Sequence, residues 1–240
     1  MKLSILIPVY NEVRTAQELL NKVLSTDLAP LEKEIIVIES GSTDGTKELI
    51  QRLEKTSGIK ALYQDRPRGK GNALKLGLKT AAGDIILIQD ADLEYDVKDY
   101  PDLLKPILEN KAAFVLGSRH LGKADWKIRK FIEHKFQARL INVGGVLHTL
   151  LFNLLYGVRL TDPATMYKVF KRECMDGLTF KSNYFELDWE IVAKFVRKGF
   201  IPVEVPVSYS SRSKEEGKKI RFFRDGFLVL WAIFRFRFFD

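Results

Sequence analysis

Short apolar runs alternate with amphipathic segments through the first half of the chain. Strands are predicted at residues 3–9, 34–38, 61–63, 85–88 and 113–117, and helices at residues 13–24, 45–53, 72–82 and 100–108. The run Ile85–Ile88 contains only isoleucine and leucine, which is typical of a strand buried on both faces. Strands separated by helical segments of this length predict right-handed strand–helix–strand units and an α/β fold with a mostly parallel sheet.

The second half has a less regular pattern. Residues 128–156 predict one long helix or two helices broken at Gly144-Gly145. The elements predicted after it are a strand at 166–171, a helix at 187–198, a half-exposed strand with two prolines at 201–209, a polar mobile loop at 210–219 and an aromatic helix at 222–239.

Two apolar segments of this half suggest a membrane surface. Residues 140–158 lack Asp, Glu, Lys and Arg, and their leucines and asparagines fall on different helix faces, so we expect an amphipathic helix in the interface, rather than in the core or across the bilayer. The tail 221–240 mixes arginines with aromatic rings, which suits a headgroup boundary better than completion of the core.

Composition narrows the class of protein. With 240 residues, 46% hydrophobic and 29% charged, the chain is neither disordered nor multispanning. Its single cysteine, Cys174, and the absence of a signal-peptide pattern after Met1 predict a cytoplasmic protein. The net charge of +8 suits nucleic acid, anionic lipid or phosphate-bearing small molecules. No helix-turn-helix, zinc or RNA-binding signature is present, so nucleic acid is disfavoured.

Polar clusters follow four successive predicted strands, at the sheet edge where ligands bind in open parallel sheets. One such cluster is usually a helix cap or a tight turn, but four together favour a ligand site. The sharpest is Asp90, Asp92 and Glu94, whose carboxylates repel one another unless a cation joins them, and Mg²⁺ suits such oxygens together with a diphosphate. Gly69-Lys70-Gly71 suits a phosphate at a helix start, although neither a P-loop nor a Rossmann motif is present.

The ordered set of motifs resembles the family-two inverting glycosyltransferases of the GT-A fold, in particular the dolichyl- and polyprenyl-phosphate mannose and glucose synthases. The matching stretches are residues 7–12, 41–46, 68–73, 90–92, 117–119, 160–163, 203–207 and 212–220. The resemblance implies a mostly parallel twisted sheet with helices on both faces and added amphipathic interface helices. It also implies a hexosyltransferase that uses Mg²⁺ or Mn²⁺.

The resemblance implies a donor site for a GDP- or UDP-hexose. Pro8, Tyr10 and Glu12 would border the base and ribose, and Asp44 would face the base. Glu39 stands where the family usually has an aspartate that contacts the nucleoside.

The same resemblance places Lys70 near the sugar-nucleotide. Asp90-Ala91-Asp92 matches the family's Asp-x-Asp motif, and Glu94 takes a position that often supplies a third metal contact.

On the acceptor side, Arg119 and Arg129 resemble the cations that hold a lipid phosphate, and Asp162 matches an aspartate near the transfer site. Arg212 and Lys218 resemble loop cations that close over the diphosphate. The expected reaction is a single displacement at the anomeric carbon, with charge on the leaving diphosphate stabilised by the metal and Arg212.

An acceptor phosphate is already ionised near neutral pH, whereas a sugar hydroxyl needs a carboxylate base. Asp188 is the candidate base. An equally weighted alternative is that Asp188 only stabilises the start of a helix through the helix dipole.

The sequence thus predicts a catalytic domain at 1–220, with an amphipathic insert at about 126–158, and an aromatic and basic segment at 221–240. We expect transfer to a polyprenyl phosphate by a peripheral protein at the cytoplasmic membrane face. The alternatives are transfer to a polysaccharide or lipid-linked glycan, a non-catalytic sugar-nucleotide-binding subunit, and a nucleotidyltransferase that would release pyrophosphate. Whether a membrane partner subunit is required stays open.

Overall fold

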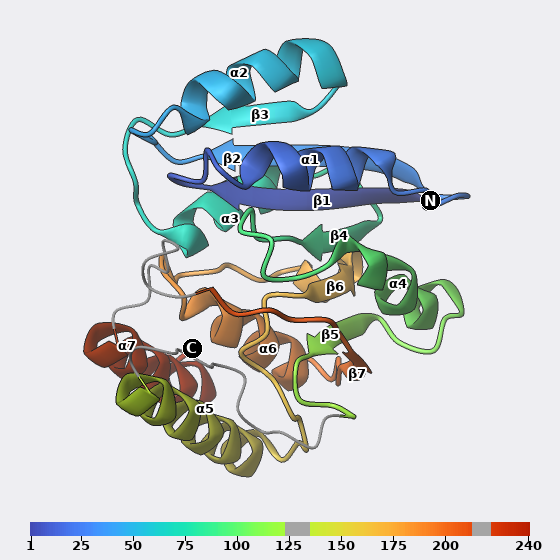
Figure 1. Cartoon of the computed structure of the whole chain (residues 1–240). Coiled ribbons are helices and arrows are strands. Elements are labelled where there is room, and N and C mark those ends of the chain that lie inside the picture. The colour runs from blue at the N-terminus through green and yellow to red at the C-terminus, as the bar shows by residue number, and fades with distance from the viewer. Residues whose placement is uncertain (123–134, 213–221) are drawn as a thin grey trace.

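The computed structural model describes residues 1–122, 135–212 and 222–240. Seven strands form one sheet in the order β3-β2-β1-β4-β6-β5-β7 (Figure 1). Their bounds are β1 Lys2–Val9, β2 Glu32–Glu39, β3 Lys60–Tyr63, β4 Ile85–Ile88, β5 Phe114–Ser118, β6 Lys168–Lys171 and β7 Val203–Pro206. All neighbouring pairs are parallel except those that β6 makes with β4 and β5, so the predicted mostly parallel sheet is confirmed.

The antiparallel strand β6 brings later residues to the ligand edge of the sheet. Leu87 of β4 pairs with Val169, so Lys168, at the start of β6, lies near the carboxyl end of β4. A parallel strand would have placed its first residue at the opposite edge. The beginning of β6 therefore joins the polar clusters that follow β1, β2 and β4.

Helices cover both faces of the sheet; Figure 1 shows α1 in front of it and α3 behind. The α-helices are α1 Ala16–Ser25, α2 Thr46–Ser57, α3 Lys70–Thr80, α4 Tyr100–Leu108, α5 Lys135–Tyr156, α6 Leu187–Arg197 and α7 Phe222–Phe238, with short 3₁₀ turns at Val97–Asp99 and Arg172–Met175. In α1 the buried positions Ala16, Leu19, Leu20 and Val23 recur at helical spacing, which is why this segment packs as a helix. The core is continuous between the sheet and these helices.

The structure corrects the predicted elements of the second half. Helix α5 runs without a break through Gly144-Gly145, where a Cβ would meet open space. The glycines cost helix stability without forcing a turn. Only Val203–Pro206 of the strand predicted at 201–209 forms a strand, followed by an isolated bridge between Tyr95 and Tyr209. The mobile loop predicted at 210–219 and the helix start predicted at 128 fall mostly outside the described residues.

Helices α5 and α7 pack against each other and against α6 (Figure 1). On α5 the polar stripe faces inward: Asn142 is buried, and the amide of Asn153 bonds both backbone groups of Leu160. The leucine stripe faces outward, and Leu150 and Leu154 are 58% and 80% exposed. Within the described residues, no helix combines the length and the hydrophobicity needed to span a bilayer.

Candidate active site

The loops after β1 and β2 are bound to each other. The backbone N–H of Asn11 donates to the Ser42 hydroxyl at 2.9 Å, and Thr43 N–H donates to the Asn11 side chain at 2.8 Å. Asp44 accepts from the backbone N–H of Val13 at 3.2 Å. Asn11 adopts a positive φ of 49°, which Asn tolerates better than most residues. The sequence therefore brings two of the four polar clusters together through mutual hydrogen bonds.

The residues expected around a nucleoside divide into two groups. Pro8, Tyr10 and Glu12 lie half-buried along the end of β1 and the residues after it, so they border the sheet edge. The carboxylate of Glu39 is fully buried and accepts from the backbone N–H groups of two loop residues, Gly41 and Ser42, at 3.1 and 2.7 Å. The Glu39 side chain therefore stabilises the loop that directly follows it.

Asp44 caps the start of α2. Its carboxylate accepts from the backbone N–H and the hydroxyl of Thr46, at 3.0 and 2.5 Å. Burial opposes ionisation, but these hydrogen bonds and the one from Val13 outweigh it and lower the pKa of Asp44.

Asp90 and Asp92, after β4, each face a cation. Lys70 Nζ lies 2.9 and 3.0 Å from the two carboxylate oxygens of Asp90. Arg212 Nη2 lies 3.0 Å from Asp92 Oδ2, and the same guanidinium makes two contacts with Glu12, at 2.8 and 3.0 Å. Arg212 thus joins the ends of β1 and β4.

Burial is the main cause of unusual ionisation at this loop. It raises the pKa of Asp92 to about 7, and the carboxylates of Asp90 and Glu94 add to the shift while Arg212 opposes it. Burial also raises the pKa of Asp90, against the effect of Lys70. Paired carboxylates with raised pKa values at a ligand edge mark a candidate functional site.

Glu94 is bound to the segment that follows β7. One carboxylate oxygen accepts from the Tyr209 hydroxyl at 2.7 Å, and the other accepts from the backbone N–H of Arg212 at 2.9 Å. The bridge between Tyr95 and Tyr209 adds a backbone connection. These contacts fix the start of the segment that carries Arg212.

Two glycines at the start of α3 let another segment approach closely. A Cβ on Gly69 would lie 2.3 Å from Asn183 O, and one on Gly71 would lie 2.8 Å from Tyr184 O. Gly69 also has a positive φ of 96°. The phosphate interpretation of Gly69-Lys70-Gly71 missed this packing, which brings the start of α6 next to Lys70.

Asp188 lies between two lysines. Its Oδ2 is 3.6 Å from Lys70 Nζ, and its Oδ1 is 3.2 Å from Nζ of the fully buried Lys168. Asp162 and Arg119 form a second buried ion pair. The Asp162 carboxylate accepts from Arg119 Nε and Nη2 at 2.7 and 2.8 Å. Sequence reasoning missed Lys168, although a lysine inside an apolar strand is a usable signal.

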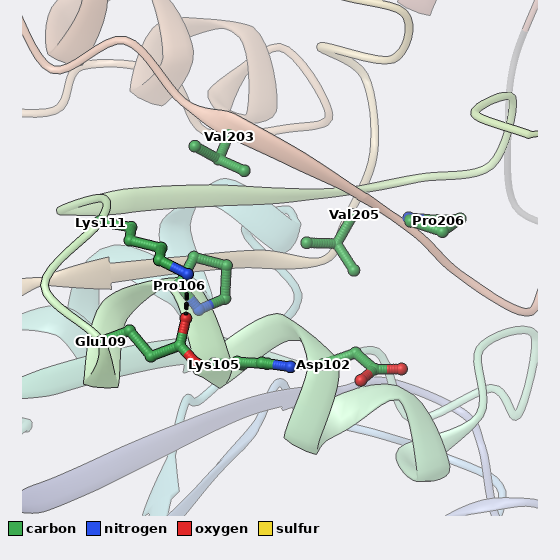
Figure 2. Close-up of a pocket in the computed structure, with 8 residues that line it drawn as sticks. All are labelled: Asp102, Lys105, Pro106, Glu109, Lys111, Val203, Val205 and Pro206. Carbon is green, nitrogen blue, oxygen red and sulfur yellow. Dashed lines mark ion pairs between the residues drawn. The ribbon is translucent and has the colours of Figure 1, made fainter.

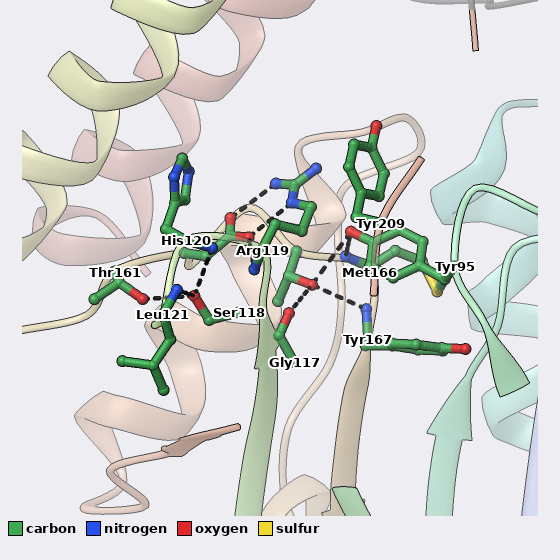
Figure 3. Close-up of polar contacts among 12 residues, drawn as sticks. Tyr95, Gly117, Ser118, Arg119, His120, Leu121, Thr161, Met166, Tyr167 and Tyr209 are labelled. Atoms are coloured by element: carbon green, nitrogen blue, oxygen red, sulfur yellow. Dashed lines mark hydrogen bonds and ion pairs between the residues drawn. The ribbon is translucent and has the colours of Figure 1, made fainter. Parts of the chain in front are cut away.

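Neighbouring residues hold the Arg119–Asp162 pair, and Figure 3 shows Arg119 together with Tyr209. Glu204 of β7 accepts from the backbone N–H of Asp162 at 2.8 Å, and the Arg119 guanidinium lies 5.2 Å from the centre of the Tyr209 ring. Burial opposes ionisation of Asp162, but Arg119 outweighs it and lowers the pKa of this carboxyl. Because Tyr209 also bonds Glu94, this residue connects the arginine at the end of β5 with the acidic loop.

The donor set after β4 fits a hard divalent cation through Asp90 and Asp92, since Mg²⁺ usually takes one or two carboxylates and completes its shell with phosphate and water. Among the residues described, no three His, Cys, Asp or Glu side chains converge into a ready metal cage. Ala91 is buried between the two aspartates. Arg129 and Lys218 lie outside the described residues.

A separate hollow of about 430 Å³ lies between α4 and the edge strand β7 (Figure 2). It is lined by Asp102, Lys105, Pro106, Glu109, Lys111, Val203, Val205 and Pro206. None of these residues belongs to the clusters described above.

The mostly parallel sheet with helices on both faces is consistent with a GT-A glycosyltransferase fold, and the family model Glycosyl transferase family 2 matches residues 4–174. The chain belongs to this family. It is 29% identical over 219 residues to the dolichol-phosphate mannosyltransferase of Pyrococcus furiosus, a match that covers 91% of this chain and 59% of that protein. This chain therefore spans about three-fifths of the length of that relative.

A second relative and a solved structure are also similar to this chain. The undecaprenyl-phosphate 4-deoxy-4-formamido-L-arabinose transferase of Aeromonas hydrophila is 27% identical over 221 residues, which cover 90% of this chain and 62% of that protein. The crystal structure of glucosyl-3-phosphoglycerate synthase from Mycobacterium tuberculosis, with Mn²⁺, uridine diphosphate and phosphoglyceric acid, superposes with a TM-score of 0.71 at 21% identity, covering 100% of this chain and 79% of that chain. The GT-A fold expected from the motifs is confirmed.

Proposed function

We propose that the protein transfers a hexose from a nucleoside-diphosphate sugar to a polyprenyl phosphate, at the cytoplasmic membrane face, with Mg²⁺ or Mn²⁺ as cofactor. The observation that carries the choice of acceptor is the pairing of two carboxylates, the candidate base Asp188 and the aspartate expected near the transfer site, Asp162. Asp162 is bound to Arg119, and Asp188 lies between Lys70 and Lys168. The oxygens of both carboxylates already contact buried cations instead of facing an acceptor hydroxyl, so the geometry suits an acceptor that arrives ionised.

The donor would bind across the ends of β1, β2 and β4. Tyr10 and Glu12 would border the nucleoside, and Asp90 and Asp92 would hold the metal. When bound, the metal would neutralise the diphosphate as it leaves. Arg212 lies 3.0 Å from Asp92, close enough to move its guanidinium from the carboxylates onto the diphosphate. Mn²⁺ or Mg²⁺ with uridine diphosphate is present in the structurally similar mycobacterial enzyme.

The acceptor would bind beside Arg119. The guanidinium of Arg119 carries five N–H groups and donates two of them to Asp162. Arg119 therefore retains donors for a phosphate, while the bonds to Asp162 fix its orientation. A phosphate oxygen would attack the anomeric carbon and the bond to the diphosphate would break, with inversion at that carbon. No proton has to be removed. The names of both relatives given above, which act on dolichol phosphate and undecaprenyl phosphate, support this acceptor class.

The membrane surface would lie against α5 and α7. Besides the leucines of α5, α7 exposes Phe227 and Trp231 by 69% and 51%, and Phe239, the residue after α7, is 72% exposed. An outward apolar stripe on two adjacent helices, with aromatic rings among arginines, suits the headgroup boundary of a bilayer. A lipid acceptor would then reach the site from the surface on which the protein rests.

The test is product analysis. The full chain with Mn²⁺ is incubated with UDP-glucose or GDP-mannose and a short polyprenyl phosphate, and lipid and nucleotide products are identified. We expect a polyprenyl-phosphate hexose and a nucleoside diphosphate. Transfer to a glycan hydroxyl instead would support the second candidate function, for which Asp188 would be the base. Release of pyrophosphate, or donor binding without turnover, would overturn the proposal.

A further inference from the structure

Four charged side chains of alternating sign lie in a row beneath the acidic loop. Lys168 Nζ contacts Asp188 Oδ1 at 3.2 Å, Asp188 Oδ2 lies 3.6 Å from Lys70 Nζ, and Lys70 Nζ lies 2.9 Å from Asp90 Oδ1. The row therefore runs from the start of β6 through the starts of α6 and α3 to the end of β4. It ends on a carboxylate of the proposed donor site.

Lys168 is placed there by the sheet itself. It is the first residue of β6, its side chain is fully buried, and its ammonium also donates to the Thr165 carbonyl. Burying an ammonium is costly unless it is paired and hydrogen-bonded. Replacing a buried ion pair by apolar residues is often neutral or stabilising, so stability alone is a weak reason for this lysine.

Asp188 contacts both Lys168 and Lys70, so Lys168 can affect the donor site through Asp188. Lys70 Nζ lies 2.9 Å from Asp90 Oδ1 and 3.6 Å from Asp188 Oδ2, so the two carboxylates compete for one ammonium. Lys168 contacts one oxygen of Asp188. The Asp188–Lys70 contact is 3.6 Å long, whereas the Lys70–Asp90 contacts are 2.9 and 3.0 Å long.

We infer that Lys168 is a positioning residue of the donor site: it neutralises Asp188, so that the ammonium of Lys70 stays directed at Asp90 and the diphosphate that binds there. This inference rests on the proposed function for the donor. Without Lys168, Asp188 draws Lys70 toward α6 and away from the end of β4, and the affinity for the metal–diphosphate falls. Removing the charge of Asp188 as well ends the competition and restores the affinity.

The experiment measures binding of Mn²⁺–UDP and Mn²⁺–GDP by calorimetry to the full chain and three variants. Lys168→Met removes the ammonium and retains most of the stem. Lys168→Met with Asp188→Asn is balanced in charge. Lys171→Met is the matched control, because Lys171 lies on the same strand and its ammonium bonds Asn110 instead.

We expect Lys168→Met to weaken binding of the preferred diphosphate about tenfold, equivalent to about 1.4 kcal/mol. The double variant should bind within about threefold of the parent, and the control should be unchanged. If Lys168→Met does not fold, near-parental binding by the double variant still supports the inference. Equal binding by parent and Lys168→Met, or a double variant as weak as the single one, overturns it. A parent that binds neither diphosphate overturns the proposed donor site and this inference with it.

Discussion

Asp92 combines burial, two carboxylate neighbours and one arginine. Its raised pKa of about 7 means that the metal-free protein holds a proton there which the unfolded chain, with a pKa near 4, releases. Between these values the folded state binds more protons, so the contribution of Asp92 to stability falls as pH rises. Ionisation of Asp92 therefore lowers the stability of the metal-free fold, whereas it favours binding of a cation.

We therefore expect Asp92→Asn to raise the free energy of unfolding of the metal-free protein at pH 8 by roughly 1–2 kcal/mol, with a smaller gain at pH 5. Urea denaturation at both pH values measures this difference. The same variant should abolish sugar transfer. Near-normal turnover at saturating Mg²⁺ and Mn²⁺ would show that Asp92 is not a metal ligand.

The roles of individual residues were predictable only where a motif marks them. The carboxylates after β4 could be predicted from their position after a strand, and Arg119 from its resemblance to a family motif; the structure places them at one sheet edge. A lysine inside an apolar strand is visible in the sequence, but the partner of Lys168 is not, because Asp188 lies 20 residues away and the two meet only through the antiparallel placement of β6. The close approach of Asn183 and Tyr184 to Gly69 and Gly71 could not be predicted, because a sequence does not show which backbone lies against a glycine.

At the scale of elements, α5 exposes one of its apolar stripes. The amphipathic pattern of residues 140–158 was predicted from the sequence, and the exposed leucines are compatible with the expected interfacial helix. The amide of Asn153 bonds the backbone of the following loop and Phe152 is fully buried, whereas Leu150 and Leu154 of the outward stripe are exposed. Hydrophobic periodicity identifies a stripe, whereas the partner of that stripe depends on the rest of the fold.

We expect Leu150→Glu combined with Trp231→Glu to abolish flotation of the protein with vesicles of phosphatidylcholine and phosphatidylglycerol. Each charge would enter an apolar boundary at a position that is more than half exposed in the protein alone. Leu108→Glu, at an exposed leucine of α4, is the control and should float like the parent. Equal flotation of the double variant would remove the membrane role of this face, and a change from dimer to monomer would assign it to a second copy of the chain.

At the scale of the whole molecule, α7 completes the structure as well as exposing aromatic rings. Ala232, Ile233 and Phe236 are almost fully buried against the neighbouring helices, and Arg197 of α6 donates to the Phe236 carbonyl. The Tyr156 hydroxyl of α5 donates to the Ile233 carbonyl. The segment after the boundary predicted at residue 221 therefore packs, as α7, in one layer with α5 and α6.

Removal of residues 222–240 should lower the melting temperature by more than 10 °C or leave the protein insoluble. Burial of an apolar side chain contributes about 1.5–3 kcal/mol, and several are lost at once. Differential scanning calorimetry measures the effect. A deletion variant that melts like the parent would show instead that 221–240 is an independent appendage.

The strand order has a consequence for synthesis. Residues 2–88 supply four neighbouring strands, so half the sheet can form early, but the second edge of β4 stays open until β6 is made about 80 residues later. That edge is a row of isoleucine and leucine with unpaired backbone groups, the kind of template on which chains aggregate. Fragments that end before residue 168 will expose it permanently, so a chain whose translation stops there is a substrate for chaperones.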